Sequence, residues 1–377
     1  MSIKLKKRKL LDCFMLFLNM LSLMALSATY LAGIISPEKF WPLAFVAMSY
    51  PIILTVTAFF IVYWLLRRKW FLFLNIAFIV LKWDYVAATV QLNSNSNQVS
   101  ADSANIKVMT YNVRLFDYYN WSNNKNTRHW IYDFLFNQQP NILCFQEFYH
   151  DKTGYFPTID TLLEVNSIRH MHVENYTKKL NKNQLWGMAT LSSYPIINKG
   201  KIEFESTYGN LCIFTDLKLD EDTVRVYNLH LQSVRIGEDQ YRFLDQIMLN
   251  KSLSGIRMKE LLGDLKLLVY RMAHAFIERG KQADLVANHI RNSPHHIILC
   301  GDFNDTPTSY SYQTLVTDLN DSFTTKGFGV GSTYVRIPFF RIDNIFYSNL
   351  FKVESHTVHP YELSDHFAVS TVLTQKD

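Results

Sequence analysis

The chain has 377 residues, with 38 Lys and Arg against 33 Asp and Glu, and 48% of its residues are hydrophobic. This length is enough for one sizeable core plus an appended region. Residues 1–90 contain ten basic and three acidic side chains, so the rest of the chain has 28 basic and 30 acidic ones. The C-terminal part therefore lacks the global basic excess with which non-specific nucleic-acid-binding proteins neutralise a phosphate backbone.

Three apolar runs follow a basic N-terminus. The first extends from Leu10 to Ile35 and the second, which carries no charge, from Trp41 to Leu66. Each is long enough to cross a bilayer as a helix. The third extends from Trp70 to about Leu92 and is interrupted by Lys82 and Asp84. We therefore predict two or three transmembrane helices that anchor the chain in a lipid bilayer.

Each end of this region has an alternative interpretation. The basic start and the first apolar run are also typical of a cleaved signal peptide, although a second long run directly afterwards favours an anchor. The third run is also compatible with an amphipathic segment that lies on the membrane surface.

The charges that flank the apolar runs predict their orientation. The N-terminus and Arg67–Lys69 are strongly basic, whereas the loop Ser36–Lys39 is neutral, so the positive-inside rule places the first two in the cytoplasm. With three spans, everything after Leu92 lies outside the cytoplasm, and with two spans it lies inside. We expect a multi-pass protein of the cytoplasmic (inner) membrane whose C-terminal domain is extracytoplasmic.

A polar segment of low complexity separates this region from the rest. Residues 93–105 are rich in Asn and Ser, which predicts a flexible linker. The chain is thus divided into a membrane anchor at 1–92, a linker at 93–105 and a folded domain at 106–377.

The folded domain alternates short apolar runs with polar clusters, which predicts an α/β protein with strands in its core and helices outside. The predicted strands are Ile106–Tyr111, Ile142–Phe145, Met188–Ser192, Leu211–Leu217, Val224–Leu229, Ile297–Cys300, Asp343–Tyr347 and Ala368–Leu373. The predicted helices are Arg128–Gln138, Gln240–Ile247, Arg257–Glu278 and Lys281–Ile290.

Six short apolar, strand-like segments each present a polar side chain of one of three chemical types at one edge. Carboxylates and an amide oxygen are ligands that a hard cation such as Mg²⁺ prefers. Imidazoles can donate to a charged phosphoryl oxygen, and a further carboxylate can activate water. A single Asn or Asp at a strand end is usually a turn former, so the ordered set carries the functional inference: Asn112, Glu147, His230, Asp302 with Asn304, Asp343, and Asp365 with His366.

This set resembles a known family. The order T-Y-N-V, Q-E, N-L-H-L, G-D-F-N-D, R-I-D-N-I and S-D-H, from about Ile106 to the C-terminus, resembles the endonuclease/exonuclease/phosphatase superfamily, which includes deoxyribonucleases, sphingomyelinases and inositol-polyphosphate 5-phosphatases. The resemblance implies a four-layer α/β sandwich, with two packed sheets flanked by helices and the site at one edge. Here an N-terminal transmembrane helical region precedes it. The implied activity is divalent-metal-dependent hydrolysis of a phosphate ester.

The resemblance also implies a role for each motif residue. Glu147 would be the main ligand of Mg²⁺, or of Mn²⁺, with Asn112 and Asp365 beside it. Asp302 would activate water, and Asn304 would bind the phosphoryl group or the nucleophile. The imidazoles of His230 and His366 would stabilise developing charge, and Asp343 would orient His366.

The motifs indicate the reaction and leave the substrate open. A phospholipid head group, a nucleic acid and a small phosphoester are all compatible substrates. We expect the N-terminal helices to contact the lipid bilayer, and we predict no protein partner. A membrane-tethered nuclease is the main alternative. A non-catalytic scaffold is disfavoured because every motif position keeps competent chemistry. The helical region Asp239–Asn292 fits either helices packed on the sandwich or a lid that presents a lipid head group.

Overall fold

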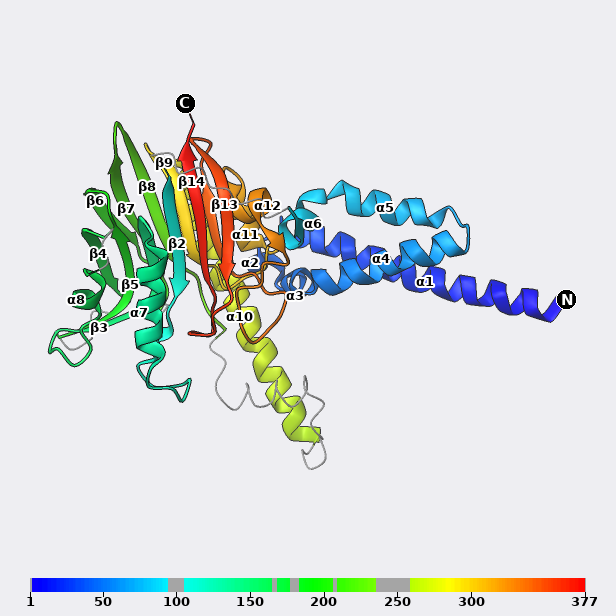
Figure 1. The fold of residues 1–377 in the computed structure, drawn as a ribbon. Helices are drawn as coiled ribbons and strands as arrows, with labels where there is room; N and C mark the ends of the chain where they lie inside the picture. The colour runs from blue at the N-terminus through cyan, green and yellow to red at the C-terminus, as the bar shows by residue number, and fades with distance from the viewer. Residues whose placement is uncertain are drawn as a thin grey trace.

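A computed structural model describes residues 2–93, 105–164, 168–176, 183–205, 209–234 and 258–376. The helix predicted at Gln240–Ile247 and nearly all of the predicted linker lie outside these residues. Figure 1 shows a β-rich domain with a bundle of helices projecting from one side, and the N-terminus lies at the far end of that bundle.

Two mixed six-stranded sheets form the centre of the domain. One has the strand order β13-β14-β2-β3-β5-β4, and the other has the order β10-β12-β9-β8-β7-β6. The pairs β2–β3 and β8–β9 are parallel. The strands of the first sheet are β2 (Ile106–Asn112), β3 (Ile142–Asp151), β4 (His170–Asn175), β5 (Gln184–Ser192), β13 (Phe351–His359) and β14 (Ala368–Gln375). Those of the second are β6 (Ile196–Ile202), β7 (Leu211–Leu219), β8 (Asp222–His230), β9 (His296–Asp302), β10 (Asn320–Asp321) and β12 (Asp343–Tyr347).

Alternation of side chains along the strands builds three apolar layers. Residues such as Val108 and Ile298 fill the space between the sheets. The opposite face of the first sheet, with Met109, packs against helix α7 (Thr127–Gln138). The opposite face of the second, with Leu299, packs against α10 (Met258–Arg291) and α11 (Tyr310–Val316). The predicted four-layer α/β sandwich is confirmed.

Each predicted strand lies within an observed one, but the sequence analysis missed four strands of the two sheets, β4, β6, β10 and β13. The two helices predicted on either side of Gly280 are one continuous helix, α10. Gly280 does not interrupt it. A Cβ atom at Gly280 would lie 3.1 Å from Cδ of Pro37, so the glycine admits the N-terminal region to this helix face. Short helices complete the domain: η1 (Arg114–Asp117), α8 (Thr158–Leu162) and α12 (Ser322–Lys326).

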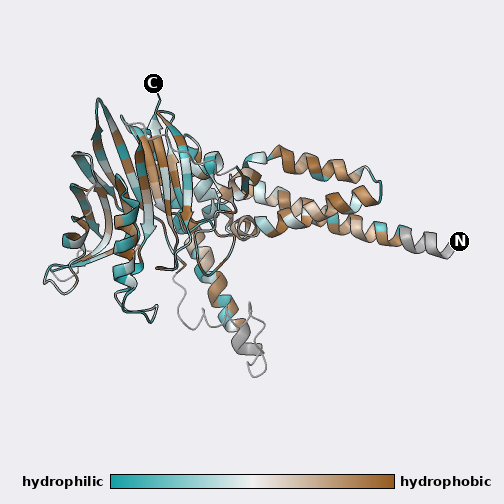
Figure 2. Ribbon diagram, in the orientation of Figure 1, coloured by the Kyte–Doolittle hydropathy of each residue, from teal (hydrophilic) through white to brown (hydrophobic). Residues whose placement is uncertain are grey.

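The N-terminal region consists of helices α1 (Ser2–Ala32), α2 (Pro37–Phe40), α3 (Pro42–Met48), α4 (Tyr50–Leu66), α5 (Phe71–Leu81) and α6 (Trp83–Thr89). Within α1, Lys9–Ala32 is long and apolar enough to cross a membrane. The pairs α3–α4 and α5–α6 are bent by 62° and 73°, so the region has up to three spans if each bent pair counts as one. Figure 2 shows the apolar character of α1, α4 and α5.

The bends differ from the straight runs expected from composition. Pro51 stands in the first turn of α4, where its ring removes a backbone donor and disfavours helical geometry in the preceding residue. The second bend lies at Lys82, whose φ of −130° and ψ of 53° are not helical. Apolar composition predicts the length of such a run but not these local breaks.

Polar contacts fix the bundle. Asn19 Oδ1 accepts hydrogen bonds from Trp64 Nε1 at 2.7 Å and from Asn75 Nδ2 at 3.1 Å. Arg67 Nη2 lies 2.7 Å from Asp12 Oδ2. The turn between α4 and α5, which carries Arg67, therefore lies toward the basic N-terminus and at the end of the bundle away from the sheets (Figure 1).

The other end of the bundle contacts the sandwich directly. The rings of Phe45 and Phe276 meet edge to face at 5.0 Å, and Thr308 Oγ1 donates to Ala47 O at 2.9 Å. Arg341 Nη2 donates to Ala88 O at 2.9 Å. The two-residue strand β1 (Gln91–Leu92) pairs with β11 (Phe328–Gly329). The regions that the sequence separates at 93–105 are thus in contact.

Candidate active site

Strand parity brings the motif side chains to one edge of the sandwich. On β9, Asp302 is in phase with Ile298 and Cys300, which point between the sheets. Its register partners are His230 on the parallel strand β8 and Asp343 on the antiparallel strand β12. Consequently the C-terminal ends of β8 and β9 and the N-terminal end of β12 present three functional groups together.

The glycine before Asp302 has a steric role. Gly301 has a φ of 144°, and a Cβ atom there would lie 2.0 Å from Leu229 O. Only glycine lets β9 approach β8 this closely at the point where Asp302 enters the site.

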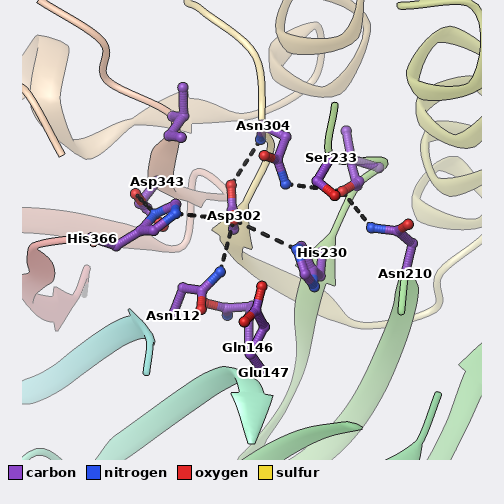
Figure 3. Close-up of polar contacts among 12 residues, drawn as sticks. Asn112, Gln146, Glu147, Asn210, His230, Ser233, Asp302, Asn304, Asp343 and His366 are labelled. Atoms are coloured by element: carbon purple, nitrogen blue, oxygen red, sulfur yellow. Dashed lines mark hydrogen bonds and ion pairs between the residues drawn. The ribbon is translucent and has the colours of Figure 1, made fainter. Parts of the chain in front are cut away.

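Asp302 lies at the centre of the polar contacts in Figure 3. Its Oδ2 accepts a hydrogen bond from Asn112 Nδ2 at 3.0 Å, and its Oδ1 accepts one from Asn304 N at 2.8 Å. His230 Nε2 and His366 Nε2 lie 3.6 and 3.7 Å from the same Oδ2. Burial raises the pKa of Asp302 above its ordinary value, although both imidazoles oppose the shift.

His366 is held by Asp343. Nδ1 of His366 donates to Asp343 Oδ2 at 2.9 Å, because a carboxylate can only accept. The backbone N–H groups of Ile342 and Asp343 both donate to Thr333 Oγ1, which fixes the start of β12. Burial alone would lower the pKa of His366, but Asp343 and Asp302 outweigh it and raise the pKa well above the usual value. This direction favours the protonated imidazole of His366, whose Nε2 faces Asp302.

Tyr176 links His230 to Glu147. Its hydroxyl lies 2.7 Å from His230 Nδ1 and accepts a hydrogen bond from Glu147 N at 3.1 Å. The hydroxyl proton can then be donated to Nδ1, which leaves the proton of neutral His230 on Nε2, facing Asp302. Tyr176 thus orients the ring of His230 and can hold it in the tautomer with the proton on Nε2.

Glu147 reaches the site through an irregularity in β3. The register with β5 shifts between Phe145 and Phe148, and Glu147 has a φ of 52°. Such a bulge redirects a side chain that regular alternation would aim elsewhere. Gln146 beneath it donates to Asn228 Oδ1 at 2.7 Å and so ties the two sheets together. Burial, with Asp365 and Asp302 nearby, raises the pKa of Glu147 to about 7.

A left-handed turn follows Asn112. The four residues Arg114–Asp117 all have φ between 44° and 56°, which costs non-glycine residues energy. Arg114 N donates to Asn112 Oδ1 at 3.1 Å, and Arg114 Nε lies 3.5 Å from Asp365 Oδ2. Its guanidinium also lies 4.5 Å from the ring centroid of Trp121. The turn therefore orients Asn112 and Asp365 from the outside.

The donor set fits a divalent cation. Potential ligand atoms of Asp302, Asp343 and His366 all lie within 4.8 Å of one another, and these three residues are buried. Asp343 Oδ1 is buried and has no hydrogen-bond partner among the described residues. In addition, the carboxylates of Glu147, Asp302 and Asp365 line the same cavity. Carboxylates crowded in this way are stabilised by a bound cation with oxygen ligands.

The structure brings all eight residues predicted from the motifs together. Seven line one cavity: Asn112, Glu147, His230, Asp302, Asn304, Asp365 and His366. Asp343 lies behind His366. The sequence analysis missed Tyr176 and Asn210, whose Nδ2 donates to Leu231 O at 2.6 Å, the same carbonyl that Asn304 Nδ2 contacts at 3.0 Å.

Two hollows meet at this centre. The first has a volume of about 390 Å³ and lies toward α10 and the N-terminal helices. The second has a volume of about 510 Å³ and is lined by aromatic side chains, among them Tyr118, Trp121 and Trp186. Glu147, His230 and Ser233 line both. The two hollows therefore adjoin at the same polar groups.

Comparisons with known proteins agree with this arrangement. The sequence model of the Endonuclease/Exonuclease/phosphatase family matches residues 109–366, and that of a domain of unknown function (DUF8431) matches residues 8–89. No curated protein matches.

Solved structures share the fold at low identity. An endonuclease/exonuclease/phosphatase family protein from Bacteroides thetaiotaomicron is 18% identical with a TM-score of 0.52, and the match covers 73% of this chain and 100% of that one. An endonuclease/exonuclease/phosphatase from Beutenbergia cavernae is 16% identical with a TM-score of 0.51 and 72% coverage of both chains. A mannosyl-6-phosphatase from Bacteroides thetaiotaomicron is 18% identical with a TM-score of 0.50, covering 71% of this chain and 99% of that one.

Proposed function

Because the chain belongs to the endonuclease/exonuclease/phosphatase family, we propose that it is a membrane-anchored, divalent-metal-dependent hydrolase of phosphate esters. One observation carries the proposal. A buried carboxylate, Asp302, is oriented through both oxygens by Asn112 and Asn304, and two imidazoles lie within 3.7 Å of it. Such preorganised groups supply the positioning and charge stabilisation that phosphoryl transfer requires.

Each side chain has a step in this proposal. Asp302 accepts a proton from the attacking water, or orients it, and the hydrogen bonds to Asn112 and Asn304 hold its carboxylate in place. His366, kept protonated by Asp343, donates from Nε2 to a phosphoryl oxygen as negative charge develops there. His230 donates from Nε2 in the tautomer that Tyr176 selects. Asn304 lies where its side chain can contact the phosphoryl group or the nucleophile.

We assign the cation to Glu147, Asn112 and Asp365, with Mg²⁺ as the ion and Mn²⁺ as a substitute. These groups offer only oxygen donors, which Mg²⁺ prefers. In the alternative set of Asp302, Asp343 and His366, Nδ1 of the imidazole already donates to Asp343 at 2.9 Å. When bound, the ion would withdraw charge from the phosphoryl group.

The two hollows favour a phosphodiester over a monoester. A diester carries two substituents on phosphorus, and two separate hollows adjoin the polar centre. A monoester would leave one hollow without a function in binding.

The bundle supports an extracytoplasmic domain. Arg67 lies at the end of the bundle opposite the sheets and on the side of the basic N-terminus, so under the positive-inside rule we expect the sheets outside the cytoplasm. A reporter fused to the C-terminus of the full chain tests this: alkaline phosphatase should be active and green fluorescent protein dark. The reverse pattern would place the domain in the cytoplasm.

Turnover of chromogenic esters tests the proposed reaction. The full chain in detergent should release nitrophenolate from bis-p-nitrophenyl phosphate with Mg²⁺ or Mn²⁺. It should lose this activity in EDTA, regain it on re-addition of metal, and act more slowly on p-nitrophenyl phosphate. Absence of metal-dependent release from both esters would favour a non-catalytic scaffold.

A further inference from the structure

The walls of the first hollow are chemically divided. Besides the catalytic groups described above, its lining includes apolar side chains, here called the apolar wall, among them Met48, Leu268, Met272, Phe276, Ile337 and Phe340. Apart from the two catalytic histidines, the basic side chain among its described lining residues is Arg279, whose guanidinium donates to Asp305 Oδ2 and to Gln232 O. The hollow therefore offers a phosphate site beside a hydrocarbon surface.

The N-terminal region forms part of this apolar wall. Met48 is the last residue of α3, and the contacts of Phe45 with Phe276 and of Ala47 O with Thr308 hold that helix against the domain. The region that carries the apolar spans therefore also borders the site. A substrate group that reaches Met48 lies at the junction between the sandwich and the apolar bundle.

Helix α10 extends the apolar wall outward. Leu268, Met272 and Phe276 are spaced by four residues and so share one face, and Leu265 continues that face toward the N-terminal end. This half of α10 leaves the sandwich crosswise to the bundle (Figure 1). Leu265 is 45% exposed, Tyr270 on the same helix 69%, and Phe339 beside the hollow 55%. Exposed apolar groups on a helix that lies crosswise to the apolar bundle fit an interfacial position on a bilayer.

We propose that the substrate is a membrane lipid phosphoester, whose phosphate lies at Asp302 and His366 and whose hydrocarbon chain lies along α10 and Met48. This inference rests on the proposed function and names its substrate class. A nucleic acid would need cations along its phosphates, and a free sugar phosphate would leave the apolar wall in contact with water.

A pair of esters with the same scissile bond tests the proposal. Hexadecyl 4-nitrophenyl phosphate and ethyl 4-nitrophenyl phosphate differ only in the retained chain. For the full chain in detergent micelles with Mg²⁺, kcat/KM should be at least about tenfold higher for the hexadecyl ester, since burial of even a few methylenes contributes that much. Release of phosphate from hexadecyl phosphate distinguishes a lipid monoester from a lipid diester as the source.

Matched variants distinguish binding of the hydrocarbon chain in the cavity from simple partitioning of the ester into micelles. Leu268→Gln, and as a milder change Met272→Gln, should each lower the hexadecyl-to-ethyl preference about tenfold, because each places a polar group on the wall. Leu285→Gln changes an exposed leucine of α10 that does not line the hollow, so the preference should stay the same. An unchanged preference in both wall variants would show that micelles alone cause it and would overturn the proposal.

Binding without turnover keeps this test independent of the proposed reaction. In the Asp302→Asn variant, hexadecylphosphonate should raise the Tm, ethylphosphonate at equal concentration should not, and Leu268→Gln should abolish the difference. If neither ester turns over but this binding is seen, the proposed reaction fails while the lipid site stands. Equal effects of the two phosphonates, or faster turnover of single-stranded DNA than of the hexadecyl ester, would contradict the lipid site.

Discussion

The hydroxyl of Tyr176 lies 2.7 Å from Nδ1 of His230 and simultaneously accepts the N–H of Glu147 at 3.1 Å. The Tyr176 side chain therefore positions both the imidazole of His230, a proposed hydrogen-bond donor to the phosphoryl group, and the backbone of Glu147, the main proposed metal ligand. Tyr176→Phe keeps the ring and removes both contacts. Because a neutral hydrogen bond contributes about 1 kcal/mol, kcat should fall roughly fivefold to tenfold with little change in KM or Tm. Tyr155→Phe, at an exposed tyrosine, is the control. A Tyr176→Phe enzyme with normal kcat would show that His230 needs no such partner.

Asp343 and His366 should act as a unit, because the carboxylate holds the imidazole protonated and oriented. Asp343→Asn and His366→Gln should each lower kcat about a hundredfold to a thousandfold. The double variant should lose little more than the worse single variant. Losses that multiply would mean that the two residues contribute separately.

Glu147→Gln should raise the Mg²⁺ concentration for half-maximal activity about a hundredfold or more, since one unit charge near a cation contributes on the order of 4 kcal/mol at an effective dielectric constant of about 20. Isothermal titration calorimetry should show the same loss of affinity. His366→Gln should instead lower kcat and leave metal affinity unchanged, and Glu221→Gln, at an exposed carboxylate, should change neither. The opposite result would place the ion at Asp302, Asp343 and His366.

Arg341 joins the sandwich to the N-terminal helices from a buried position. Its Nη2 lies 2.8 Å from Asp321 Oδ2 and 2.9 Å from Ala88 O. Arg341→Met removes the partner of a buried carboxylate and should lower the free energy of unfolding by about 3–5 kcal/mol. Denaturation in detergent measures this change, with Arg291→Met on the exposed end of α10 as the control. A loss below about 0.5 kcal/mol, the usual range for surface changes, would mean that the contact between the two regions does not stabilise the fold.

The sequence predicted the sandwich well, because buried strands require apolar runs. It also pointed to motif residues at the ends of apolar runs, and the structure brings these residues together. Strands β4, β6 and β13 are less apolar than the predicted strands, and the sequence analysis therefore did not predict them. In β4, Met171 and Val173 alternate with His170, His172 and Glu174, and this period of two was the signal that would have led to Tyr176.

Other features depend on contacts between distant segments. The bulge that turns Glu147 into the site is set by pairing with β5, and Gly280 within α10 lies against Pro37 of the N-terminal region. The apolar wall shared by Met48 and Phe276 joins residues more than two hundred positions apart. Composition predicted the apolar helices of the N-terminal region but could not show that this region borders the cavity.

The turnover of Asp302→Asn tests the central claim most directly, because the substitution keeps the shape of the side chain and removes its charge. The purified full-length variant should match the parent protein in Tm and bind Mg²⁺ with similar affinity. Its Mg²⁺-dependent kcat on bis-p-nitrophenyl phosphate should fall by roughly a hundredfold to ten-thousandfold, the range for loss of a general base. Near-normal turnover by a folded Asp302→Asn protein would contradict the account and move the activation of water to another carboxylate.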